Sequence, residues 1–169
     1  MRRGGFAALL LAGCSGPTNA VDKSPTAAIP ELETAAIAAG VIPDPVGVDL
    51  TGLYARDTDR VCIVPARQGF AIGIFVDYGD QQLCSAAGTA TKLGETLTVT
   101  LAGAPGCAFD ARFEGDRVVL PGALPAACAK LCSGRASMTA LDVRQLSDSV
   151  SEAQTMRDSK GKLLCSGDE

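Results

Sequence analysis

The sequence has no histidine and no tryptophan, and its only aromatic residues are five phenylalanines and two tyrosines. Without histidine, the Ser-His-Asp and Cys-His catalytic arrangements are excluded, and the most frequent general base is missing. Zinc sites favour repeated Cys-x₂₋₄-Cys spacings, and the chain has a single one, so we expect no metal and no cofactor. Because aromatics are scarce, we expect a core of Val, Leu, Ile and Ala.

The sequence also lacks an excess of basic residues and, beyond its first residues, any long apolar run. The formal net charge is −4 at pH 7. Binding to nucleic-acid phosphates needs a basic face, so no nucleic-acid partner is expected. No later segment has the eighteen or so consecutive apolar residues of a transmembrane helix. The length suggests one domain with extensions.

The chain begins with a short apolar segment that has a specific ending. MRR precedes GGFAALLLAG, and a positive region followed by about ten apolar residues is typical of a secretory signal and too short for a membrane span. The segment ends in Leu11-Ala12-Gly13-Cys14, which resembles the lipobox of bacterial lipoproteins. The resemblance implies a signal peptide over residues 1–13, cleavage before Cys14, and a diacylglycerol on the Cys14 thiol.

Lipidation of Cys14 predicts a protein anchored in a bacterial cell envelope. Each buried methylene contributes about 0.8 kcal/mol, so several acyl chains hold a protein on a membrane effectively permanently. By the same resemblance, Ser15 in the position where Asp signals inner-membrane retention favours the outer membrane, with the domain facing the periplasm. Removal of the leader takes away Arg2 and Arg3 but no acid, which changes the net charge from −4 to −6.

Residues 14–49 have the composition of a tether between membrane and domain. Prolines interrupt any continuous strand or helix along it. Within the tether, PELETAAIAAG predicts a short helix, with Pro30 at the first helical position and Gly40 just past the end. Its shallow apolar face, which includes Leu32, indicates a helix that docks on the domain more readily than on a partner. The prolines of the tether are Pro17, Pro25, Pro30, Pro43 and Pro45.

Six cysteines remain for a domain over residues 50–169, and an even number in an exported chain indicates disulfides. Cys128 and Cys132 are four residues apart in a predicted helical turn, so we expect them to bond to different partners. Cys-x-x-Cys, the spacing of thioredoxin-like redox sites, is absent. We favour Cys107 and Cys165 as partners of that pair, which leaves Cys62 with Cys84. The six are Cys62, Cys84, Cys107, Cys128, Cys132 and Cys165.

Residues 50–146 have the pattern of seven or eight short antiparallel strands. TLTVTL at 96–101 and AFDARF at 108–113 alternate between the two faces of a strand. RASMTALDVRQL at 135–146 predicts the last strand. We therefore predict a mainly β domain, a small disulfide-stapled antiparallel barrel or sandwich with short peripheral helices. A barrel is favoured because closure removes exposed strand edges.

The sequence of the C-terminal region predicts a helix followed by a tail that a disulfide holds on the domain. Ser149-x-x-Glu152 is a capping box, and apolar residues follow it at helical spacing. The SKGK segment at 159–162 ends the helical pattern. Cys165 then attaches the tail to the domain.

Carboxylates are the only remaining candidates for catalysis, as the pairs Asp57 with Asp59 and Asp77 with Asp80. Acids at turns usually stabilise the turn and stay solvated, so we expect no enzyme. Tyr54 and Tyr78 are interpreted either as exposed interface anchors or as half-buried strand residues. Five arginines near strand ends are interpreted as ordinary surface charge or as an anion-recognition surface: Arg56, Arg60, Arg67, Arg112 and Arg117.

The opening of the domain, GLYARDTDRVCIV at 52–64, resembles small β-barrel envelope proteins that inhibit lysozymes or proteases. The resemblance rests on Gly-x-aromatic in the first strand and a cysteine in the next. The lysozyme-inhibitor motif Ser-Gly-x-x-Tyr is absent, so no inhibitory residues carry over. We expect a non-catalytic binding module that inhibits or scaffolds a periplasmic protein. The alternative is a structural accessory of an outer-membrane or envelope assembly.

Overall fold

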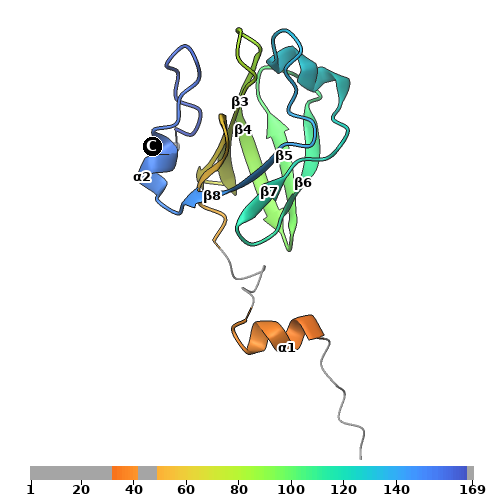
Figure 1. Ribbon diagram of the computed structural model, residues 1–169, viewed down its shortest axis with the longest axis vertical. Coiled ribbons are helices and arrows are strands. Elements are labelled where there is room, and N and C mark those ends of the chain that lie inside the picture. Colours follow the sequence, from red (N-terminus) through yellow and green to blue (C-terminus); the bar gives the residue numbers. More distant parts are fainter. Residues whose placement is uncertain (1–31, 42–48, 167–169) are drawn as a thin grey trace, which may run out of the picture.

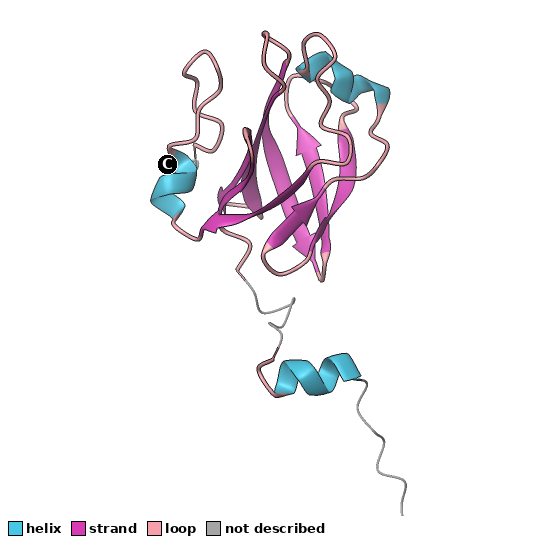
Figure 2. Cartoon of the chain, viewed as in Figure 1, coloured by secondary structure: helices cyan, strands magenta, loops and turns pink. Residues whose placement is uncertain are grey.

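The computed structural model describes residues 32–41 and 49–166, and residues 52–147 of this part form a closed antiparallel β-barrel (Figures 1 and 2). Each strand pairs with its neighbours in the chain, and β8 pairs with β1 to close the sheet. The mainly β prediction and the preference for a barrel are confirmed. The strands are β1 Gly52–Arg56, β2 Asp59–Pro65, β3 Phe70–Asp77, β4 Leu83–Leu93, β5 Thr96–Leu101, β6 Ala108–Phe113, β7 Arg117–Val119 and β8 Asp142–Ser147.

The interior of the barrel is filled by side chains that alternate along the strands. In β5, Leu97, Val99 and Leu101 are buried while the threonines between them are exposed. β6 follows the same pattern, with Phe109 and Phe113 inside. As the composition predicts, aliphatic residues make up most of this main core. Alternation of this kind requires one buried and one solvated face.

A second apolar layer covers the outside of β2, which is therefore buried on both faces. Val61 and Ile63 face the barrel interior, whereas Cys62 and Val64 belong to a separate outer cluster. The C-terminal segment supplies the other side of that cluster: Ala153, Met156, Leu164 and Cys165. Burial on both faces explains the continuous apolar run VCIV, where period-two alternation is lost.

One end of the barrel is closed by the chain between β7 and β8. This segment contains the 3₁₀ helix η1, Ala126–Leu131. Residues before and after η1 join the main core, namely Leu120, Met138 and Leu141. The strand predicted at 135–146 is therefore wrong over 135–141, and β8 begins only at Asp142. Ala136, Met138 and Leu141 are buried because they pack against the open end of the barrel, not because they belong to a strand. Leu141 N–H donates to the Met138 carbonyl in a tight turn there.

Two short helices lie outside the barrel, as predicted. α1 spans Leu32–Ala38 and is followed by Gly40 with φ +68°. The predicted docking of its apolar face is wrong for Leu32, which is 88% exposed. α2 spans Val150–Gln154 (Figure 1), and the Ser149 hydroxyl accepts the Glu152 N–H as the capping box predicts. The predicted signal peptide, Cys14 and most of the tether lie outside the described residues.

The six cysteines of the domain form three disulfides. Cys128 and Cys132 have different partners, as predicted, and Cys107 is one of them. The predicted Cys62–Cys84 pair is wrong: Cys62 belongs to the outer cluster and Cys84 to the main core, so the two side chains lie on opposite faces of the sheet. Cys165, predicted to bond to one of the Cys128 and Cys132 pair, bonds to Cys62 instead. The pairs are Cys62–Cys165, Cys84–Cys132 and Cys107–Cys128.

Candidate functional site

A groove of about 760 Å³ lies on the outer surface of the barrel, beside β4. We call it the outer groove. Its floor consists of small residues of β4 and of the β5–β6 turn, among them Ser85, Ala87 and Gly103. The end of η1 forms one wall and the C-terminal segment forms the other. The lining residues are Gln81, Leu83, Ser85, Ala86, Ala87, Ala102, Gly103, Lys130, Leu131, Cys132, Ser133, Asp158, Ser159, Lys160, Lys162 and Leu164.

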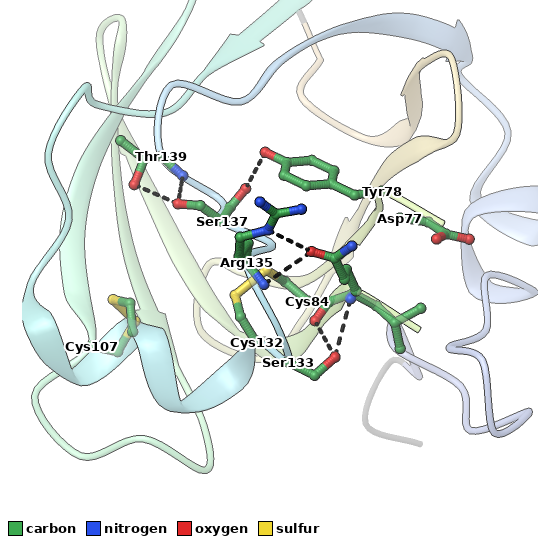
Figure 3. The surroundings of a disulfide bond; sticks show 12 residues. Asp77, Tyr78, Cys84, Cys107, Cys132, Ser133, Arg135, Ser137 and Thr139 are labelled. Carbon is green, nitrogen blue, oxygen red and sulfur yellow. Dashed lines mark hydrogen bonds between the residues drawn. A yellow bond between two sulfur atoms is a disulfide. The ribbon is translucent and has the colours of Figure 1, made fainter. Parts of the chain in front are cut away.

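The η1 wall is attached to β4 by a disulfide and by hydrogen bonds around Ser133. Cys132 is bonded to Cys84 of β4. Directly after it, Ser133 N–H donates to the Leu83 carbonyl at 2.7 Å, and the Ser133 hydroxyl donates to the Gln81 carbonyl at 2.7 Å. Figure 3 shows Ser133 next to this disulfide, at the start of β4. This wall therefore has little freedom to move away from the strand.

The C-terminal wall is attached to the barrel by the Cys62–Cys165 disulfide. Within this wall, the Asp158 carboxylate accepts the backbone N–H groups of Lys160 and Lys162, each at 2.8 Å. Its other oxygen accepts the Ser85 hydroxyl at 3.5 Å, which joins the wall to the floor. These bonds, foremost that from Lys162 N–H, hold the pKa of Asp158 below its usual range. Asp158 is therefore ionised at neutral pH.

Lysines are concentrated around the outer groove. Of the four in the described part of the chain, Lys130, Lys160 and Lys162 line it, and only Lys92 lies elsewhere. Within the described part of the chain, none of these three groove lysines forms an ion pair. The groove lining thus carries three exposed cations and one carboxylate, Asp158, a formal charge of +2. A chain with a net charge of −4 concentrates positive charge here.

The arginines considered from the sequence do not form one anion-binding surface. Arg117 donates to both carboxylate oxygens of Asp142, at 2.6 and 2.5 Å, and holds the pKa of Asp142 below its usual range. Arg112 pairs with Glu114, and Arg56 lies 4.0 Å from Asp142. Arg60, in β2, donates to the backbone carbonyls of Asp57 and Asp59 at the β1–β2 turn. Arg67 lies in the β2–β3 turn.

The carboxylates considered for catalysis are brought together in a different combination from the predicted one. Asp59 of β2 accepts the backbone N–H of Asp77 at 3.2 Å, and Asp77 accepts the N–H of Gly79 at 2.8 Å. Asp57 and Asp80 lie in turns with φ +50°. Within residues 32–41 and 49–166, no group of three or more acids and cysteines could hold a metal. These acids stabilise the turns at one end of the barrel.

The two tyrosines occupy opposite environments. Tyr54 is fully buried, and its hydroxyl donates to the Leu50 carbonyl at 2.7 Å. Both interpretations from the sequence are therefore wrong for Tyr54, and burial raises the pKa of its phenol above the usual range. Tyr78 is 55% exposed, and its hydroxyl donates to the Ser137 carbonyl at 3.2 Å, which links the β3–β4 turn to the chain that closes the barrel (Figure 3).

No protein-family model, curated protein or solved structure matches this chain. None of the helices in the described part has the length and apolar character that a membrane crossing needs. Sequence reasoning missed the outer groove because its lining comes from segments far apart in the chain, at 81–87, 102–103, 130–133 and 158–164. The only sequence signal was the position of three of the five lysines in the last forty residues.

Proposed function

We propose that this chain is a lipid-anchored bacterial envelope protein whose barrel is a non-catalytic binding module. In this proposal the outer groove holds part of a periplasmic or envelope protein. The observation that carries the proposal is the attachment of both walls of the groove to the barrel by separate disulfides, Cys84–Cys132 and Cys62–Cys165. A rigid groove loses little conformational entropy on binding, which favours recognition of a partner.

The filled interior supports binding on the outside of the barrel. The largest fully buried side chains, Tyr54 and Phe113 among them, occupy the space where larger barrels hold a ligand. The outer groove, at about 760 Å³, is within the size range of binding sites. Recognition by this domain is therefore assigned to its outer surface.

Two features support a non-catalytic role. The sequence supplies no histidine, and the acids considered for catalysis, Asp59 and Asp77, accept hydrogen bonds from backbone N–H groups. Asp158, the carboxylate in the groove lining, also accepts backbone N–H groups and has a lowered pKa. A general acid or base needs the opposite, a pKa near the working pH.

The anchor is tested at Cys14. The expected result is that the protein purified from membranes lacks residues 1–13 and has acyl chains on Cys14, as seen by mass spectrometry of the N-terminal peptide. The Cys14→Ala variant is expected to be released from the membrane fraction. If the purified protein begins at Met1 or carries no acyl chain, the lipoprotein assignment is incorrect.

The groove is tested by photocrosslinking in the native envelope. A photoreactive residue is placed at Ser159, which is exposed in the groove lining. The matched control position is Thr96, which is exposed at the start of β5, whereas the groove lies beyond the end of that strand. We expect a discrete protein adduct from Ser159 and none from Thr96, identified by mass spectrometry. A hydrolase in the adduct indicates an inhibitor, and a subunit of a membrane complex indicates a structural accessory. Equal labelling from both positions, or none, contradicts binding in the groove.

A further inference from the structure

We infer that the outer groove recognises an acidic peptide segment, with the carboxylates of the ligand on Lys130, Lys160 and Lys162. This inference rests on the proposed function and specifies the chemistry of the partner. Three observations carry it: the placement of the lysines, the occupied backbone donors of the C-terminal wall, and the apolar residues between the two walls.

The placement of the lysines favours an anionic ligand. Lys130 comes from the η1 wall and Lys160 and Lys162 from the opposite wall, so the cations flank the groove on two sides. Among the described residues, none of the three takes part in an ion pair. Lysine is a single cation on a flexible stem, which suits carboxylates whose positions vary along a peptide.

The backbone N–H groups of Lys160 and Lys162 in the C-terminal wall are already in use, which argues against a phosphate. Phosphate sites combine several free backbone N–H groups with basic side chains, often the planar fork of arginine. Here the N–H groups of Lys160 and Lys162 both donate to the Asp158 carboxylate. The groove lining contains no arginine among the described residues. The cations that the described lining offers to an anionic ligand are therefore the three lysine ammonium groups.

The apolar part of the lining favours a peptide over other polyanions. Leu83, Leu131 and Leu164 line the groove together with the small residues of its floor. None of the described lining residues is aromatic, so the groove offers no surface on which a nucleic-acid base can stack. A peptide supplies both kinds of group, since acidic side chains reach the lysines while small apolar side chains lie against the leucines.

The test measures peptide binding to the full chain carrying Cys14→Ala, by fluorescence anisotropy. The probe is a labelled peptide of alternating Glu and Ala, and its control alternates Gln and Ala. We expect the acidic peptide to bind at least about tenfold more tightly, and its affinity to fall as NaCl is raised from about 0.05 to about 0.5 M. Equal binding of the two peptides, or no binding of the acidic one, overturns the inference.

The lysines are tested with the triple variant Lys130→Gln, Lys160→Gln and Lys162→Gln. We expect it to bind the acidic peptide at least about tenfold more weakly, because three exposed ion pairs are lost together. The matched control is Lys92→Gln, which removes the remaining described lysine; Lys92 lies 4.8 Å from the Phe113 ring and outside the groove. Unfolding temperatures of both variants establish that the fold is retained. Unchanged binding by the triple variant refutes the assignment.

A further arm separates a peptide from a membrane surface as the ligand. Vesicles of phosphatidylglycerol and phosphatidylcholine replace the peptide, and we expect no lysine-dependent binding to them. Binding to the vesicles without binding to the acidic peptide overturns the inference in favour of a lipid. If the Ser159 photoadduct forms but survives in the lysine triple variant, the acidic-peptide inference fails while the proposed function stands. Absence of the adduct counts against the proposed function itself.

Discussion

Gly73 of β3 and Leu164 of the C-terminal segment approach each other so closely that no side chain fits between them. A Cβ at position 73 would lie 2.6 Å from Leu164 Cβ and 2.7 Å from the Sγ of Cys62. Both distances are far below van der Waals contact. The hydrogen atom of Gly73 therefore allows the C-terminal wall of the outer groove to lie flat on the sheet.

Replacing Gly73 by alanine is expected to lift the C-terminal segment and lower the free energy of unfolding by about 1 to 3 kcal/mol, as overpacking does in other proteins. Urea denaturation gives the loss, and hydrogen exchange of residues 156–165 locates it. Gly122→Ala is the matched control, since a Cβ there has no neighbour within 4 Å. Equal stability of the two variants would show that the close approach is not significant.

The disulfide pairing is expected from peptide mapping without reduction as Cys62–Cys165, Cys84–Cys132 and Cys107–Cys128. Recovery of a Cys62–Cys84 peptide would contradict the structure. Replacing Cys62 and Cys165 together by serine is expected to lower stability by about 2 to 5 kcal/mol, because the bond closes a long loop in the unfolded chain. The same variant should expose the C-terminal segment to proteases.

Removing the buried hydroxyl of Tyr54 is expected to lower the free energy of unfolding by about 1 to 2 kcal/mol. Tyr54→Phe deletes the hydrogen bond to the Leu50 carbonyl. Both residues are buried, so water does not replace the lost donor. Denaturant unfolding gives the value. Tyr78→Phe is the comparison, since it deletes a bond at a half-exposed side chain and is expected to change stability less. Equal effects would contradict the burial of Tyr54.

The raised pKa of Tyr54 predicts loss of stability at high pH. Burial keeps the phenol protonated in the folded state, whereas the unfolded chain releases the proton near pH 10. The contribution to stability is therefore complete below about pH 10 and declines as the pH rises further. In Tyr78→Phe, absorbance near 295 nm is expected to report phenolate only as the protein unfolds. Titration of Tyr54 in the folded state near pH 10 would refute this.

Asp142 predicts a loss of stability at low pH. Its hydrogen bonds from Arg117 lower its folded pKa, so its contribution is complete above the pKa of the unfolded carboxyl, about 3.9, and is lost as the pH falls below it. Asp142→Asn is expected to be less stable than the natural chain at neutral pH, with a smaller difference at about pH 2. Asp110→Asn serves as the control. A constant difference across this range would contradict the ion pair.

Much of the barrel is predictable from local patterns because its strands are solvated on one side. In β5 and β6 every second residue is apolar and buried, and the residues between them are exposed. This period of two identifies the buried face from the sequence alone. The capping box at Ser149 is equally local, since its hydroxyl bonds an N–H three residues away. Errors occurred where tertiary contacts change the pattern, as at Met138, whose burial comes from the end of the barrel rather than from a strand.

The disulfide pairing and the outer groove depend on distance in space. Cys62 is 103 residues from Cys165, and only the passage of the C-terminal segment across β2 and β3 brings them together. The groove lysines come from η1 and from the turn at 158–162, which form the two walls of one groove beside β4. Nothing in the local sequence around Lys130 or Lys160 specifies that these two segments line the same groove.

The sequence by itself determined the class of domain, a count of seven or eight short strands and the presence of disulfides. Strand alternation and turn residues act over a few residues, and the cysteines can be counted without knowing the fold. The tertiary structure decided which cysteines pair, that β8 closes on β1, and that three lysines surround one groove. Those outcomes follow from the register and curvature of the whole sheet, which depend on packing between segments far apart in the chain.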